Sequence, residues 1–234
     1  MKKISMTILM CLITVCTVYA QGWFAPFSKQ EINSFHQDVK KGRLSKELQN
    51  ALQRTALINS TDKDGNTPLM MATYKGNAKM VALLLENGAQ KSINWRNYHG
   101  MTALCIAAQM KRVKTVALLL SKGADPNLKC GFGDDAASPL YLAAYYGAVP
   151  QIIQALVAQG ADVNFAKKNG DTPLIKVAQR GGVDAARILV KAGADIHAEV
   201  KYVGDGAKTA TGIAKNHANW EVFRFLLKRG GVTK

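Results

Sequence analysis

The sequence predicts an all-α protein, a solenoid of stacked helix-turn-helix units with β-hairpin fingers between them. One pattern returns about every 35 residues: a Thr-Pro-Leu type of opening, an alanine-rich stretch, an apolar run and a Gly-Ala pair. The openings occupy residues 67–69, 102–104, 138–140 and 172–174. A unit this short cannot bury an apolar face by itself, so the stacking of neighbouring units must create the core. Such a fold indicates a binding surface rather than a catalytic cavity.

The first helix of each unit is predicted from its opening residues. Thr67, Ser138 and Thr172 suit the N-cap, because a hydroxyl there accepts a hydrogen bond from an otherwise unpaired backbone amide. The proline that follows each of them has no amide hydrogen to lose and a φ already close to the helical value. The alanines of this helix allow the neighbouring unit to approach closely; they are Ala72, Ala107, Ala108, Ala143, Ala144 and Ala178.

The second helix of each unit carries the larger apolar side chains. In the first unit Met80, Val81 and Leu84 recur at helical spacing and make one apolar stripe with Leu85. A glycine follows this helix in every copy, at the position where the chain turns left-handed and a Cβ is unfavourable. These glycines are Gly88, Gly123, Gly160 and Gly193. The polar stretch after each of them is predicted to form a finger.

These features resemble the ankyrin repeat, closely over residues 62–231 and loosely over 28–60. The copy at 209–231 is degenerate and is predicted to be the C-terminal cap. The fingers at 127–139 and 200–208 are longer than the others. The histidine that the family places after Thr-Pro-Leu is replaced here, so we expect its hydrogen-bond network to be absent. The replacing residues are Met70, Cys105, Tyr141 and Ile175.

Residues 21–60 are predicted to be an N-terminal helical cap, a divergent repeat that precedes a repeat domain at 61–234. Ser28 and the glutamate three residues later have the spacing of a capping box. Gly42 is expected to end this helix, and a second helix is expected to begin near Ser45. The apolar side chains on one face of the first helix are Ile32, Phe35 and Val39.

Residues 1–20 have the three parts of a secretory signal peptide: two lysines near the start, an apolar stretch of 15 residues and a small residue, Ala20, at the cleavage position. Cleavage there leaves Gln21 first and places the protein in a bacterial periplasm, or outside the cell. An uncleaved anchor is the weaker interpretation, because a bilayer span needs roughly 20 residues. Lipid attachment at Cys11 or Cys16 is weaker still, because neither follows a small residue.

The chain is strongly basic, with 31 Lys and Arg against 16 Asp and Glu and a net charge of +15. Loss of the two leader lysines leaves +13. The excess favours an acidic partner, either a protein face or an anionic membrane surface, drawn by long-range attraction; a basic charge without a specific role is the alternative. We expect no nucleic-acid partner, because the lysines are dispersed and no nucleic-acid motif is present. We also expect a monomer without a transmembrane anchor after signal cleavage.

Cys105 and Cys130 are the two cysteines outside the leader. In an oxidising compartment two cysteines in adjacent repeats favour a disulfide. The alternative is a buried small side chain at Cys105 and an unrelated exposed thiol at Cys130, and the distance between the two decides the question.

The residues offer no catalytic set, so the protein is not predicted to be an enzyme, and no cofactor or metal is expected. The four histidines, His36, His99, His197 and His217, have no metal-ligand spacing. A nucleophile elbow and a phosphate-binding loop are also missing from the sequence. The acidic pair at 134–135 could hold a cation, but solvation on an exposed finger is the more common role of such a pair.

The resemblance implies that partners contact the finger tips and the exposed ends of the first helices, a surface that we call the concave face. Tyrosine, methionine and arginine are enriched in the cores of interfaces. The alternative for Tyr145 or Tyr146 is a structural role, packed against the next finger. The predicted partner-binding residues are Tyr74, Lys75, Tyr98, His99, Met110, Phe132, Tyr145, Tyr146, Lys168 and Arg180.

The predicted function is that of an exported protein-interaction module that binds a partner through the concave face and inhibits or neutralises it, as an immunity or inhibitor protein does. The alternative is a periplasmic scaffold that supports or protects a resident envelope enzyme, for example in oxidative-stress defence.

Overall fold

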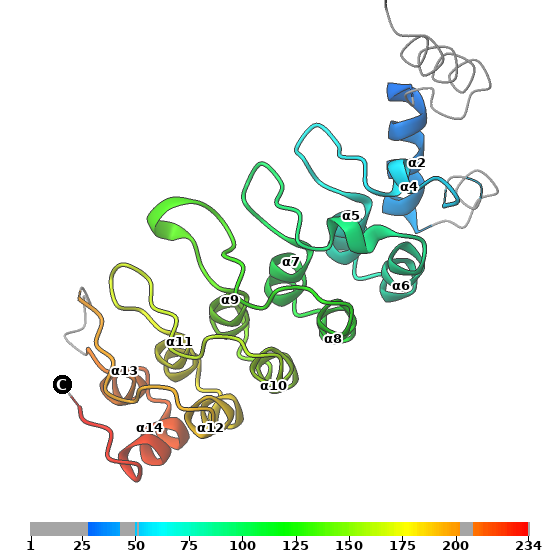
Figure 1. The fold of residues 1–234 in the computed structure, drawn as a ribbon. Helices are drawn as coiled ribbons and strands as arrows, with labels where there is room; N and C mark the ends of the chain where they lie inside the picture. The colour runs from blue at the N-terminus through cyan, green and yellow to red at the C-terminus, as the bar shows by residue number, and fades with distance from the viewer. Residues whose placement is uncertain (1–27, 43–49, 51, 202–207, 234) are drawn as a thin grey trace, which may run out of the picture.

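The computed structural model describes residues 28–42, 50, 52–201 and 208–233, and this part of the chain is an all-α solenoid, which confirms the predicted fold class (Figure 1). The first helices of the repeats lie side by side in one layer and the second helices in another, with the fingers beyond the first layer (Figure 1). The helix pairs in chain order are α5 (Pro68–Lys75) with α6 (Ala78–Glu86), α7 (Ala103–Gln109) with α8 (Val113–Ser121), α9 (Pro139–Tyr146) with α10 (Pro150–Ala158), α11 (Pro173–Arg180) with α12 (Val183–Lys191), and α13 (Ala210–Asn216) with α14 (Trp220–Leu227).

Three predicted segments lie outside the described residues. They are the leader at 1–20, the helix expected from Ser45, and the tip of the finger at 200–208, of which residues 202–207 are not described.

Each first helix begins at the predicted hydroxyl cap. The side chains of Thr67, Ser138 and Thr172 accept hydrogen bonds from the backbone amides three residues later, at 3.3, 3.1 and 3.4 Å. Thr102 and Thr209 cap the two helices whose openings lack proline in the same way. The hydroxyl is therefore the constant signal for the start of this helix, and proline is an addition to it.

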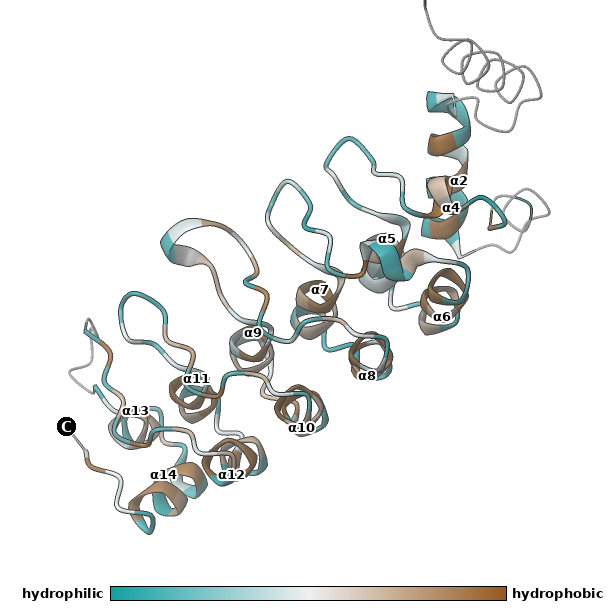
Figure 2. Ribbon diagram, in the orientation of Figure 1, coloured by the Kyte–Doolittle hydropathy of each residue, from teal (hydrophilic) through white to brown (hydrophobic). Residues whose placement is uncertain are grey.

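The core lies between neighbouring repeats and between the two helical layers. The alanines of the first helices are buried, and so is one leucine stripe of the second helices, which includes Leu84, Leu119, Leu156 and Leu189. The helices of both layers are accordingly rich in apolar residues, while the fingers are more polar (Figure 2). After the second helices, Gly88, Gly123, Gly160 and Gly193 have φ between 80° and 109°, in the left-handed region as predicted.

The N-terminal cap packs against the first repeat. Helix α2 (Lys29–Lys41) begins with the predicted capping box, in which the Ser28 hydroxyl accepts from the Glu31 amide at 3.1 Å and the Glu31 carboxylate accepts from the Ser28 amide at 2.9 Å. Its residues Phe35 and Val39 are buried, and the helix contacts α5. The short helix α4 (Thr55–Ile58) then leads into the first finger.

The fingers are compact turns linked to one another by backbone hydrogen bonds. In the first, second and fourth fingers a glycine amide donates back to the residue three positions earlier, as Gly100 does to Asn97 at 2.8 Å. Adjacent tips are joined by bonds such as the one from Tyr98 N to Asp64 O, 3.1 Å long. Within the described residues, β pairing is confined to the isolated bridges Cys130–Ala137 and Glu199–Thr209, so the two long fingers are the most hairpin-like. Short 3₁₀ turns, η1 (Ala89–Ser92) and η2 (Gly133–Asp135), complete the loops.

Candidate protein-interaction surface

The predicted partner-binding residues lie on the first helices and the fingers and fall into two groups with some outliers. The first group lines a cavity at the N-terminal end of the array. The second is an aromatic and cationic cluster on α9 and α11. Tyr98, Phe132 and Lys168 belong to neither group and lie on the fingers.

The N-terminal cavity has a volume of about 770 Å³ and lies between α2, α5, α7 and the first two fingers. Four of the predicted residues line it: Tyr74, Lys75, His99 and Met110. Three further methionines, Met70, Met71 and Met101, contribute to its wall. Methionine side chains adapt their shape to an apolar ligand. The cavity is thus suited to an apolar side chain of a partner, with charged groups at its edge.

His36 is a buried polar residue in the wall of this cavity. Its Nε2 lies 3.0 Å from the Ser60 hydroxyl, while Nδ1 makes no hydrogen bond within the described residues. Burial lowers the pKa of the His36 imidazole below its ordinary value, and the nearby Asp62 carboxylate only partly opposes this effect. The ring is therefore neutral at neutral pH and helps to hold α2 on the first repeat.

The second group centres on Tyr145, whose side chain is 40 % exposed. Its ring packs edge-to-face against Tyr146, with centroids 4.9 Å apart. The ammonium of Lys176 lies 5.7 Å from the ring centroid and the guanidinium of Arg180 lies 5.4 Å from it. Cations over an aromatic face are attracted by the ring quadrupole. This cluster therefore presents a half-exposed aromatic surface that is already held in position.

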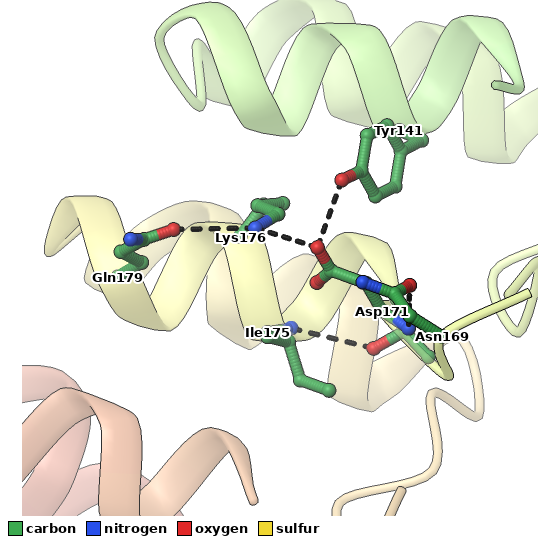
Figure 3. A network of polar contacts seen from close by, with 7 residues as sticks. Tyr141, Asn169, Asp171, Ile175, Lys176 and Gln179 are labelled. Carbon is green, nitrogen blue, oxygen red and sulfur yellow. Dashed lines mark hydrogen bonds and ion pairs between the residues drawn. The ribbon is translucent and has the colours of Figure 1, made fainter. Parts of the chain in front are cut away.

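A hydrogen-bond network supports this cluster on its buried side. Figure 3 shows the network between α9 and α11. The Tyr141 hydroxyl donates to Asp171 Oδ2 at 2.9 Å, and Lys176 Nζ makes an ion pair with the same oxygen at 2.6 Å. Lys176 also reaches Gln179 Oε1 at 3.3 Å. Burial and the Asp171 carboxylate raise the pKa of the Tyr141 hydroxyl, which keeps it protonated as a donor.

The expectation that replacement of the family histidine abolishes the network is therefore wrong for the third repeat. Tyr141 occupies that position, and its longer side chain reaches the next finger at Asp171. Met70 and Ile175 at the matching positions are buried apolar residues.

The three outliers have local partners on the fingers. Phe132 lies under the guanidinium of Arg96, which is 4.8 Å from the ring centroid. Lys168 pairs with Asp134 across neighbouring fingers at 2.7 Å, with both side chains largely exposed. Asp134, expected to be only solvated, thus has a cationic partner. Tyr98 packs along the glycine turn of the first finger and, among the residues that the structure describes, is the most exposed aromatic residue.

Cys105 and Cys130 form a disulfide in the structure, with Cα atoms 5.8 Å apart. Cys105 lies on α7 and Cys130 at the base of the long third finger, and both are buried. The bond ties that finger, which carries Phe132, to the second repeat. Within the described ranges, no three His, Cys, Asp or Glu side chains gather as metal ligands, and every helix is too short or too polar to cross a bilayer.

Several surface residues are found only in the structure. Lys176 could not be identified from the sequence, because spacing alone does not show that its ammonium lies over the Tyr145 ring. Trp95 is about half-exposed, and its indole donates to Gly65 O at 3.0 Å. Its place just before the second finger is a signal that could have identified it.

Comparisons with known proteins agree with this architecture. A family model described as "Ankyrin repeats (3 copies)" matches residues 35–130 and 140–233, so the match includes the second half of α2 as well as the five helix pairs. The transient receptor potential cation channel subfamily A member 1 of Drosophila melanogaster is 30 % identical over 148 residues. That segment covers 63 % of this chain and 12 % of the channel protein, so the similarity concerns a small part of that relative.

Proposed function

Because the chain belongs to the ankyrin-repeat family, a family of protein-interaction modules, we propose that it is an exported binding protein that holds a partner on its concave face and inhibits or neutralises it. The family is typically non-catalytic, and the residues of the concave face are of the kinds that bind rather than react. Export and the acidic partner each have separate support, and the activity assay described below tests inhibition.

The observation that carries the proposal is the cluster around Tyr145. Tyr145 and Tyr146 are both partly exposed. The Tyr145 ring is held by the cations Lys176 and Arg180 of α11, and Tyr146 packs edge-to-face against it. An aromatic residue that is already immobilised loses little conformational freedom on binding and still has apolar area to bury. A purely structural role would leave less of both rings accessible to a partner.

Export is supported by two independent features. The first 20 residues have the pattern of a cleaved leader. The disulfide between Cys105 and Cys130 is a bond that persists mainly in oxidising compartments such as the periplasm. N-terminal sequencing of the protein from its natural host should begin at Gln21, and recovery of the intact chain from the cytoplasm would end this part of the proposal.

An acidic partner is supported by the charge of the chain and of the site. The net charge is +15, or +13 without the two leader lysines. On the concave face Lys75 lies beside Tyr74 in the cavity wall, and Arg180 lies over the Tyr145 ring. Such cations accelerate encounter with an acidic surface and discriminate against basic partners.

The test is capture followed by an activity assay. The purified protein and the variant Tyr145→Ala/Arg180→Ala are immobilised and exposed to a periplasmic extract. We expect the wild type to capture one protein that the variant does not capture. We also expect the activity of that captured protein to fall when the wild type is added. A captured partner whose activity is raised or protected supports the scaffold alternative. Equal capture by both forms would contradict a concave-face site.

A further inference from the structure

A second, cationic pocket is formed by residues of α12 and α14. Both helices belong to the layer of second helices, which lies on the side of the array away from the fingers (Figure 1). The pocket has a volume of about 460 Å³. Its lining residues recur at three- and four-residue spacing, so one face of each helix builds it. They are Val183 and Arg187 on α12, and Glu221, Arg224, Phe225, Lys228 and Arg229 on and just after α14.

Phe225 holds two of the cations in position. The guanidinium carbons of Arg187 and Arg229 lie 5.0 and 5.3 Å from the centroid of its ring. Stacking on a ring restricts a guanidinium while its N–H groups stay directed to solvent. The ring itself is only partly buried, so an apolar floor accompanies the two cations.

The charge of this pocket is unbalanced. It contains four cations, Arg187, Arg224, Lys228 and Arg229, and one carboxylate, Glu221. Within the described residues none of these four cations takes part in an ion pair. Four exposed cations in a hollow repel each other and attract an anionic ligand. Arginine, the most frequent of them, suits a planar carboxylate because its fork of N–H groups can bind both oxygens.

We propose that this pocket binds an acidic, extended segment of a partner protein, with side-chain carboxylates on the arginines and an apolar side chain against Phe225. A peptide fits better than a membrane surface because the cations line a hollow with an apolar floor. A flat anionic surface would contact only the rim of this hollow. The pocket lies in a different helical layer from the concave face, so the inference does not depend on the proposed function.

The experiment measures binding of fluorescein-labelled octaglutamate to the purified protein by fluorescence anisotropy. The pocket variant is Arg187→Gln/Arg229→Gln. The matched control, Lys114→Gln/Lys122→Gln, removes the same charge from exposed positions at α8. We expect the pocket variant to weaken binding at least tenfold and the control to weaken it less than threefold. The conservative variant Arg187→Lys/Arg229→Lys keeps the charge, but its affinity for octaglutamate should still fall several-fold, because lysine cannot make the bidentate contact.

Thermal melting of each variant checks that it remains folded. Equal losses in the pocket variant and the control would show a general charge effect and overturn the proposal. So would undiminished binding by the pocket variant, or absence of binding by the wild type. Binding to vesicles that contain phosphatidylserine, lost in the pocket variant while octaglutamate does not bind, would assign the pocket to a membrane and also overturn it.

Discussion

Lys176 is the residue on which the aromatic cluster of the concave face depends most. Its side chain is 15 % exposed, and its ammonium joins the buried Asp171 carboxylate, Gln179 and the face of the Tyr145 ring. The other Asp171 oxygen is buried and makes no hydrogen bond within the described residues. A buried carboxylate is tolerated only while its partners remain. Removing one partner therefore destabilises the fold by more than the intact ion pair stabilises it.

Replacing Lys176 by methionine should therefore lower the free energy of unfolding by about 3–5 kcal/mol, since Asp171 is left without its cation. The matched control is Lys168→Met, which removes the lysine of the exposed pair with Asp134 and should cost less than about 1 kcal/mol. Urea unfolding measures both values. Similar losses of unfolding free energy in the two variants would show that burial of the Asp171–Lys176 pair does not increase the cost of removing its lysine.

His36 makes the stability of the N-terminal cap depend on pH. Its pKa is lowered in the folded protein, chiefly by burial, from an ordinary value of 6.5. Below pH 6.5 the unfolded chain binds a proton that the folded ring does not, so stability should fall as the pH decreases from 6.5 toward the folded pKa. We expect His36→Gln to remove this part of the slope and NMR to show the His36 ring titrating below 6.5. A ring that titrates above 6.5 would contradict this interpretation.

At the scale of the element, the long third finger differs from the others because it is covalently attached. The disulfide joins its base to α7, and the backbone bridge between Cys130 and Ala137 closes it. Its tip is held by Arg96, which donates to Gly131 O and stacks on Phe132. The finger is thereby attached to the second repeat both at its base and near its tip.

Reduction should loosen this element. A disulfide across a sequence separation of 25 residues should stabilise by about 3 kcal/mol through its effect on the unfolded chain. Reductant should lower the melting temperature of the wild type and leave that of Cys105→Ala/Cys130→Ala unchanged. Non-reducing peptide maps should show one cross-linked pair. A wild type indifferent to reductant, with no cross-linked peptide, would show that the thiols are free in solution.

The sequence was sufficient to predict the helices and their caps because those depend on local chemistry that every repeat carries. Thr102 and Thr209 continue the pattern even without proline. The contacts of the candidate site were harder to predict from the sequence. Tyr141 and Asp171 are 30 residues apart, and whether the tyrosine reaches the next finger depends on how two repeats stack. The methionines of the N-terminal cavity likewise come from separate elements, so their meeting is visible only in the folded array.

At the scale of the whole molecule, stacking of units with the same helix-turn-helix architecture produces two surfaces with different chemistry. The concave face combines aromatic residues, methionines and cations, while the layer of second helices carries the arginine pocket near its C-terminal end. Each repeat contacts only its neighbours, so changes in one surface should have little effect on distant repeats. A long partner, or two partners, could therefore use both surfaces, and joint use would raise the apparent affinity of each.

The central claim is that the concave face holds the partner, and the affinity of Tyr145→Ala for the captured partner tests it most directly. Surface plasmon resonance should show a loss of about 2 kcal/mol or more, roughly thirtyfold in Kd, as for an aromatic residue at an interface centre. The matched control is Trp220→Ala, which removes a somewhat more exposed aromatic residue from the other layer and should leave the affinity unchanged. If Tyr145→Ala melts like the wild type and binds the partner with undiminished affinity, the partner does not bind at this face.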